Sequence, residues 1–180
     1  LTLEYYGQAL SRPDLLSSLG FSLCISLVSA VLAVIGGVIL SALLTRSRAS
    51  RSLQLLTIGV ALVTAHILVV LAMTTLFSGS GLLARLLHAF GIVSDVGAFP
   101  SIVSARSGVG VILVYLWKEI PFVAFMTLTI MMNISSSLGE AARTLGASPS
   151  RAFFTITLPL CSGAIARAFL IVFAFSFGAY

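Results

Sequence analysis

Hydrophobic and polar positions divide this chain into four long apolar runs separated by polar segments. The runs cover residues 15–44, 53–77, 108–132 and 160–180. Each approaches or exceeds the ~20 residues with which an α-helix crosses the ~30 Å hydrocarbon core of a bilayer. None shows the alternation and regular turn spacing of a membrane β-barrel. We therefore predict an all-α, polytopic membrane protein whose four membrane helices form a single domain over residues 1–180.

The composition supports lipid as the main surrounding of the chain. Hydrophobic residues make up 59% of it and charged residues only 8%, whereas a soluble domain carries about 25% charged residues. The basic residues sit between apolar runs and form no surface interleaved with aromatic residues, so we predict a membrane lipid environment and no nucleic-acid partner. Cys24 and Cys161 have no metal-ligand spacing, and we predict no metal site.

The polar segments at residues 45–52 and 133–159 fall on the same side of a four-helix serpentine. Together they hold five arginines, which are Arg46, Arg48, Arg51, Arg143 and Arg151. The positive-inside rule places this side in the cytoplasm and the segment at residues 78–107 outside. Within that outer segment, leucines recur at helical spacing over residues 82–90, which predicts a short amphipathic helix at the membrane interface.

One face of the first apolar run carries only small side chains. Ala33, Gly37 and Ser41 recur at every fourth residue. Such a stripe lets the backbone of a second membrane helix approach closely, and we therefore predict a helix-packing face.

Charged residues interrupt the third apolar run near its middle. Trp117, Lys118 and Glu119 stand just before Pro121. A charge at that depth costs about 3 kcal/mol, so these groups need partners or a water-filled path. His66 is a candidate partner because it lies at a similar depth in the second run. These residues either line a solute path or hold helices together; as an alternative function, they serve an ion-coupled secondary transporter as a proton relay.

Lys118 also excludes one kind of activity. It is the only lysine of the chain, and the Gly-Lys-Ser/Thr loop that binds ATP phosphates needs a lysine that follows glycine. We also find no nucleophile and base arranged for catalysis in the membrane. We therefore predict that the chain is not an enzyme, with no catalytic residue and no cofactor, and that any ATPase is a separate subunit.

The segment at residues 133–159 has the capping signals of two short helices. Ser137 and Glu140 form the S-x-x-E pattern that begins a helix. Gly146 stands where a left-handed helix end needs glycine, and Ser148 before Pro149 is a second helix start. Pro159 is expected to end the second helix, so the segment should be a cytoplasmic loop with a fixed bend.

This loop resembles the EAA loop of binding-protein-dependent ABC importer permeases. The residues that carry the resemblance are Glu140, Ala141, Ala142, Gly146, Ile156, Leu158 and Pro159. The segments at residues 117–122 and 3–6 are also similar to this family. The resemblance implies a portion of the type I ABC importer permease fold, with one further membrane helix before residue 1 and about one after residue 180.

The resemblance also implies roles and partners. The EAA loop of the family docks on the ATPase, and this role transfers to Glu140, Ala141, Ala142, Arg143, Gly146 and Pro159. The implied partners are ABC ATPase subunits, a second permease subunit that is the same or homologous, and an external solute-binding protein, in the bacterial inner membrane. Leu145 stands before Gly146, where sugar permeases often have aspartate. This favours the permeases for polyamines, iron, sulfate, thiamine or phosphonates.

Overall fold

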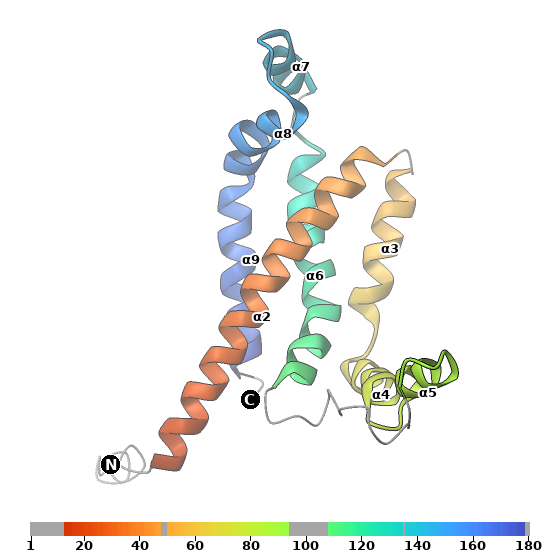
Figure 1. Ribbon diagram of the computed structural model, residues 1–180. Coiled ribbons are helices and arrows are strands. Elements are labelled where there is room, and N and C mark those ends of the chain that lie inside the picture. The colour runs from red at the N-terminus through yellow and green to blue at the C-terminus, as the bar shows by residue number, and fades with distance from the viewer. Residues whose placement is uncertain (1–12, 48–49, 94–107, 135, 179–180) are drawn as a thin grey trace, which may run out of the picture.

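The computed structural model describes residues 13–47, 50–93, 108–134 and 136–178, and within these ranges it contains helices and no strand (Figure 1). The helices are α2 (Pro13–Arg46), α3 (Arg51–Val63), α4 (His66–Phe77), α5 (Leu82–Ala89), α6 (Val109–Met131), α7 (Ser136–Thr144), α8 (Pro149–Ala152), the π-helical turn η2 (Phe153–Thr157) and α9 (Leu158–Gly178).

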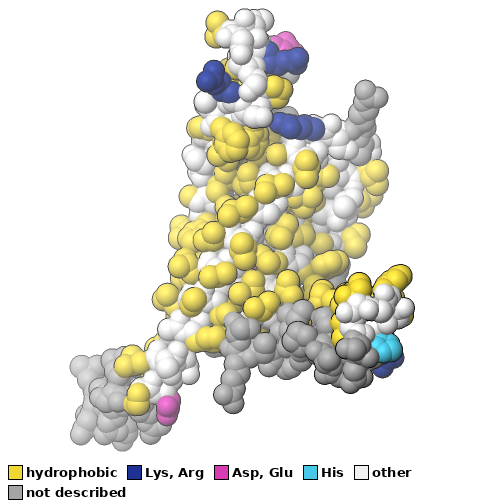
Figure 2. Space-filling view, in the orientation of Figure 1, with side chains coloured by type: hydrophobic (Ala, Val, Ile, Leu, Met, Phe, Trp, Pro, Cys, Tyr) yellow, Lys and Arg dark blue, Asp and Glu magenta, His cyan; other side chains and the backbone are white. Residues whose placement is uncertain are grey.

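Four stretches are long and apolar enough to cross a membrane. They are Pro13–Arg46, His66–Ala89, Val109–Met131 and Pro149–Gly178, while Arg51–Val63 is a shorter apolar helix. Figure 2 shows basic side chains gathered at the end of the bundle that carries α7 and α8. The predicted outer segment at residues 3–6, Arg48, and most of the predicted external segment after α5 lie outside the described residues.

Helices α2, α6 and α9 form the packed frame of the molecule. Their common core consists of five fully buried side chains, Ala30, Ala33, Val123, Ala168 and Val172. A Cβ atom on Gly37 would lie 2.6 Å from the Cβ of Val123, so the backbones of α2 and α6 approach closely there. The Thr127 hydroxyl donates a hydrogen bond to Ser41 Oγ at 3.0 Å. The small-residue stripe of the first apolar run is therefore confirmed as a packing face.

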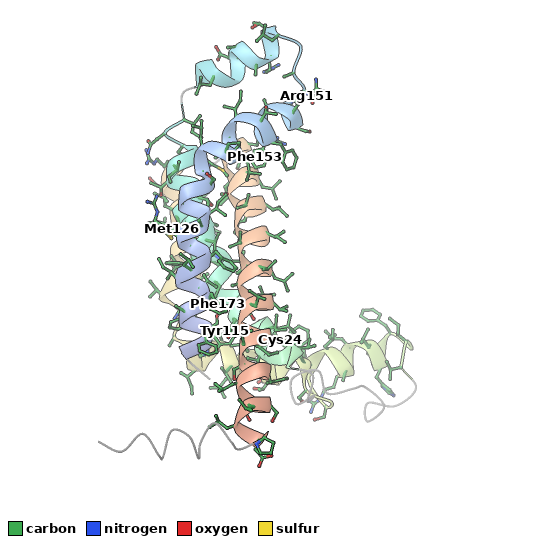
Figure 3. The ribbon with its side chains drawn as sticks, turned by 90° about the vertical axis from the view of Figure 1, so that its left-hand side faces the viewer. Cys24, Tyr115, Met126, Arg151, Phe153 and Phe173 are labelled. Atoms are coloured by element: carbon green, nitrogen blue, oxygen red, sulfur yellow. The ribbon has the colours of Figure 1, made fainter. Side chains whose placement is uncertain are left out.

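The second apolar run is not one helix, and the prediction of a single membrane helix over residues 53–77 was wrong. The backbone is extended at Thr64 (φ −58°, ψ 123°) and Ala65 (φ −61°, ψ 137°), between α3 and α4. Helix α3 runs alongside α6, whereas α4 and α5 project sideways from the lower end (Figures 1 and 3). The sequence did not predict this break for two reasons. Hydropathy indicates how apolar a segment is but not whether its helix changes direction, and the break contains no glycine or proline.

The predicted N-cap of the first loop helix was one position or more too late. Helix α7 begins at Ser136, so Ser137 stands inside the helix and not at its N-cap position. Three consecutive serines, Ser135–Ser137, all offer a capping hydroxyl, and the sequence pattern alone does not choose among them.

The predicted bend after α7 is confirmed. Gly146 has a φ of +84°. Its N–H donates to the Arg143 carbonyl at 3.0 Å, and the Ala147 N–H donates to the Ala142 carbonyl at 2.9 Å. These two bonds make a Schellman motif, in which glycine avoids the steric penalty of the left-handed conformation. The Ser148 side chain then accepts a hydrogen bond from the Arg151 N–H, which confirms the second helix start.

Pro159 does not end the second loop helix, contrary to the prediction. Helical structure continues from Pro149 to Gly178 through the π-helical turn η2. The Leu158 N–H donates to the Phe153 carbonyl, five residues earlier, directly before the proline. A proline ring clashes with the carbonyl four residues before it in a regular α-helix, and the wider π-turn at this position accommodates it.

Candidate functional site

Helix α7 lies over the ends of α2 and α6 that carry Arg46 and Met131, and it encloses a cleft of about 410 Å³ with them and α8. Gly139, Glu140 and Arg143 line this cleft from α7, and Arg46 lines it from the end of α2. The charged side chains of α7 therefore face the body of their own chain.

The outward face of α7 is apolar. Leu138 is 45% exposed and Leu145, directly after the helix, is 89% exposed. Ala141 is also exposed and lies between them at the i, i+3, i+7 spacing of one helix face. The sequence analysis assigned Glu140 to the contact with the ATPase, whereas in the structure Glu140 lines the cleft. The spacing of Leu138, Ala141 and Leu145 was the signal that would have identified the outer face.

A second candidate site lies within the membrane-crossing part. A cavity of about 170 Å³ between α3, α6 and α9 is lined by Leu62, Lys118, Glu119, Phe122, Ile171 and Phe175. Glu119 is only 6% exposed. Among the residues that the structure describes, it forms no hydrogen bond and no ion pair. The cavity therefore contains a buried carboxyl group with free hydrogen-bonding capacity, and two phenylalanine side chains also line it.

The structure does not bring all four predicted path residues together. Lys118 and Glu119 share the cavity, but Trp117 is 51% exposed outside it. His66 begins α4, where its ring centroid lies 5.9 Å from that of Tyr115. Tyr115 lies one helical turn from Glu119 toward the lower end of α6, so His66 is not at the depth of the cavity. The helix break at Thr64 and Ala65 is the physical reason.

Sequence reasoning also missed Arg167, which lies in the middle of α9 and is exposed. The helical stretch Pro149–Gly178 contains both Arg151 and Arg167, and sixteen residues of helix span about 24 Å. A single charge inside the fourth apolar run was the available signal, because intramembrane charges mark functional positions by default.

Comparison with known proteins identifies the class to which this architecture belongs. The family model described as "Binding-protein-dependent transport system inner membrane component" matches residues 33–180. The chain therefore belongs to this family of transport permeases and is a multi-pass component of the inner membrane.

Individual relatives and one solved structure agree with this class. The chain is 30% identical over 173 residues to the putrescine transport system permease protein PotI of Escherichia coli K12, covering 96% of this chain and 57% of that protein. It is 30% identical over 148 residues to the chloroplastic sulfate permease 2 of Chlamydomonas reinhardtii, covering 82% and 37%.

The solved structure is that of a bacterial ABC transporter involved in the import of the acidic polysaccharide alginate. The TM-score is 0.77 at 17% identity, and the match covers 96% of this chain and 60% of the other. This likeness shows the fold, a portion of an ABC importer permease. The chain spans less than two thirds of the length of each of these three proteins. None of the three supports the alternative of ion-coupled transport.

Proposed function

We propose that the chain is part of the permease subunit of an ABC importer, where it forms part of the solute path and couples to a separate ATPase subunit. The observation that carries the proposal is the helical element above the membrane frame, formed by α7, the Gly146 bend and α8. Because α8 continues through η2 into α9, a displacement of α7 is transmitted directly to a membrane helix.

The proposed contact with the ATPase is the outward face of α7. Leu138, Ala141 and Leu145 present an apolar strip at the cytoplasmic end, and exposed apolar side chains there suit burial in a groove of a protein partner. Glu140 and Arg143 line the cleft on the other side of α7, where they hold the helix at its angle. Ala142 keeps the helix thin, and Gly146 fixes the bend.

Two further partners complete the proposed importer. A second permease subunit, identical or homologous, closes the path against this chain. An external solute-binding protein delivers the solute at the opposite end from α7.

The proposed role of Pro159 is to place the π-helical turn between α8 and α9. Through this turn, a displacement of the loop reaches the membrane helix α9.

The proposed solute site is the cavity that holds Lys118 and Glu119. A carboxylate in a cavity that Phe122 and Phe175 also line suits an ammonium group, because aromatic faces and carboxylates both attract cations. A polyamine, or another small charged compound, is therefore the proposed solute, in keeping with the similarity to a putrescine permease. Trp117 and His66 lie outside the cavity, and we propose no solute contact for them.

The decisive test of the coupling role uses two glycines of the loop. Neither Gly139 nor Gly146 has an atom within 4 Å of where a Cβ would stand, but only Gly146 has a positive φ. Gly146→Val is expected to lose about 1–2 kcal/mol of local backbone stability and to alter the angle of α7. The matched Gly139→Val keeps a regular helical backbone. The measurement is co-purification of the ATPase and solute-stimulated ATP hydrolysis in reconstituted membranes.

We expect Gly146→Val, and also Leu145→Asp on the outward face, to weaken ATPase binding or uncouple hydrolysis while the chain stays inserted. Glu140→Lys reverses the charge in the cleft and is expected to act in the same direction. Full ATPase binding and full stimulated hydrolysis in all three variants would overturn the coupling assignment.

The solute site has its own test. Glu119→Gln removes the negative charge and keeps the size of the side chain, so we expect uptake to fall at least tenfold, which corresponds to about 1.4 kcal/mol, while the yield of the complex is unchanged. Asp14→Asn is the matched control, since it neutralises an exposed carboxylate at the start of α2, outside the cavity and the loop. Unchanged uptake in Glu119→Gln, or loss of the complex, would assign Glu119 a structural role instead.

A further inference from the structure

Arg167 is a charged side chain on the outer surface of a membrane helix. It is the tenth residue of α9 and is exposed. Its Nη2 atom lies 4.0 Å from the position that a Cβ on Gly163 would occupy, so the guanidinium extends one turn toward the cytoplasmic end. Within the described part of the chain it forms no hydrogen bond and no ion pair. An arginine at this depth and facing lipid would be strongly unfavourable.

The face of α9 that carries Arg167 continues into the Glu119 cavity. Ile171 and Phe175 follow Arg167 at intervals of four residues, and both line the cavity with Glu119. Four residues of helix rise about 6 Å, so Arg167 stands about one turn above the level of Ile171 on the same side of the helix. Gly163 stands one turn before Arg167 on the same side of the helix, and its lack of a side chain leaves space beside the guanidinium.

The outer face of α2 has the opposite character. It presents a large apolar side chain at every fourth residue, namely Leu19, Leu23, Leu27, Val31, Ile35, Ile39 and Leu43, all of them exposed. That face suits lipid over its whole length. The α9 face is interrupted at mid-depth by a charge and small residues, which suits water or a polar partner.

We propose that the Arg167 face of α9 lines the water-filled solute path, and that Arg167 places a fixed positive charge on the cytoplasmic side of the Glu119 cavity. The ligand class is a small cationic solute, an inference that rests on the proposed function. Glu119 attracts the ammonium group, and Arg167 repels it from moving one turn farther inward. The solute is thereby held at Glu119 until the helices move and change the position of the arginine.

Thiol labelling of the complex in membrane vesicles tests this placement. In a background with Cys24→Ser and Cys161→Ala, Gly163→Cys puts a thiol beside Arg167, because a Cβ on Gly163 would lie 4.0 Å from its Nη2 atom. Val31→Cys is the matched control on the α2 face, near the same depth because its neighbours Ala30 and Ala33 pack in one cluster with Ala168, about one turn along α9 from Gly163. The probes are two small water-soluble thiosulfonates, one carrying a sulfonate and the other a trimethylammonium group.

We expect Gly163→Cys to react at least tenfold faster than Val31→Cys, because only the former meets water. Arg167→Gln should lower the ratio of anionic to cationic labelling rates on the order of tenfold, whereas Arg167→Lys should preserve it. A labelling rate equal to that of Val31→Cys would overturn the path assignment, and a ratio unaffected by Arg167→Gln would overturn the charge role. Since labelling needs no ATPase coupling, a failure here is distinguishable from a failure of the proposed function.

Discussion

Two parts of the molecule have similarly apolar sequences but pack very differently. One is the interface between α2 and α6, called here the α2–α6 seam, and the other is the pair of helices α3 and α4 at the edge of the bundle. Helix α2 buries seven residues, of which only Ile25 is large. The other six are alanine, glycine or serine, namely Ser26, Ser29, Ala30, Ala33, Gly37 and Ser41. Helix α3 buries only Gln54 and Ile58, and its Val60 and Val63 are 70% and 86% exposed. A groove of about 860 Å³ follows the break between α3 and α4.

The difference shows what holds this molecule together. Lipid tails are as apolar as leucine, so apolar side chains alone do not drive membrane helices together. Association depends on close backbone approach and on hydrogen bonds between helices, and the α2–α6 seam provides both. Helices α2, α6 and α9 are therefore the stable frame, whereas α3, α4 and α5 are an edge with few close contacts.

The largest expected effect comes from filling the seam. Gly37→Leu would place a Cβ 2.6 Å from the Val123 Cβ and 3.0 Å from the backbone nitrogen of Ala124, which cannot move aside like a side chain. We expect a loss of about 3 kcal/mol in the free energy of unfolding. Gly59→Leu is the matched change on α3, where no atom lies within 4 Å of the added Cβ. Folded yield and unfolding in mixed detergent micelles measure both.

A smaller effect is expected from the hydrogen bond across the seam. Thr127→Val and Ser41→Ala each remove the bond between the two hydroxyls. The remaining Ser41 still donates to the Val38 carbonyl, and the remaining Thr127 turns its single proton to the Val123 carbonyl, 2.8 Å away, so neither is left unpaired. We expect each variant to lose about 0.6 kcal/mol. In the double variant, the loss in the free energy of unfolding should be smaller than the sum of the two single losses. A loss equal to that sum would show that the hydrogen bond contributes no stability.

Much of the cytoplasmic loop was readable in advance, because its signals are local. The positive φ of Gly146 and the cap at Ser148 depend on a few neighbouring residues, and both were predicted. The start of α7 was misplaced since Ser135–Ser137 are chemically equivalent caps. The apolar strip on the outward face of α7 was not predicted, although Leu138, Ala141 and Leu145 recur at helical spacing, because the family resemblance assigned the contact to Glu140.

The mid-membrane site was predicted only in part. Lys118 and Glu119 are adjacent in sequence, and their shared location near mid-depth follows from the helix itself. Their companions Phe122, Ile171 and Phe175 come from the packing of α6 against α9, which no local pattern records. His66 was predicted at the same depth because the second apolar run was taken as one unbroken helix. The extended backbone at Thr64 and Ala65 places His66 away from the cavity instead.

By itself the sequence determined that the chain is helical and lies in a membrane, where the bend between α7 and α8 falls, and which stripe of α2 packs against a neighbour. These properties follow from apolar length, side-chain size and capping, each of which acts over a few residues. Only the tertiary structure decided which charges share a cavity, which way α7 turns its apolar strip, and how the chain passes Pro159. Those outcomes depend on contacts between residues far apart in the chain, or on a choice between backbone geometries that local sequence leaves nearly equal in energy.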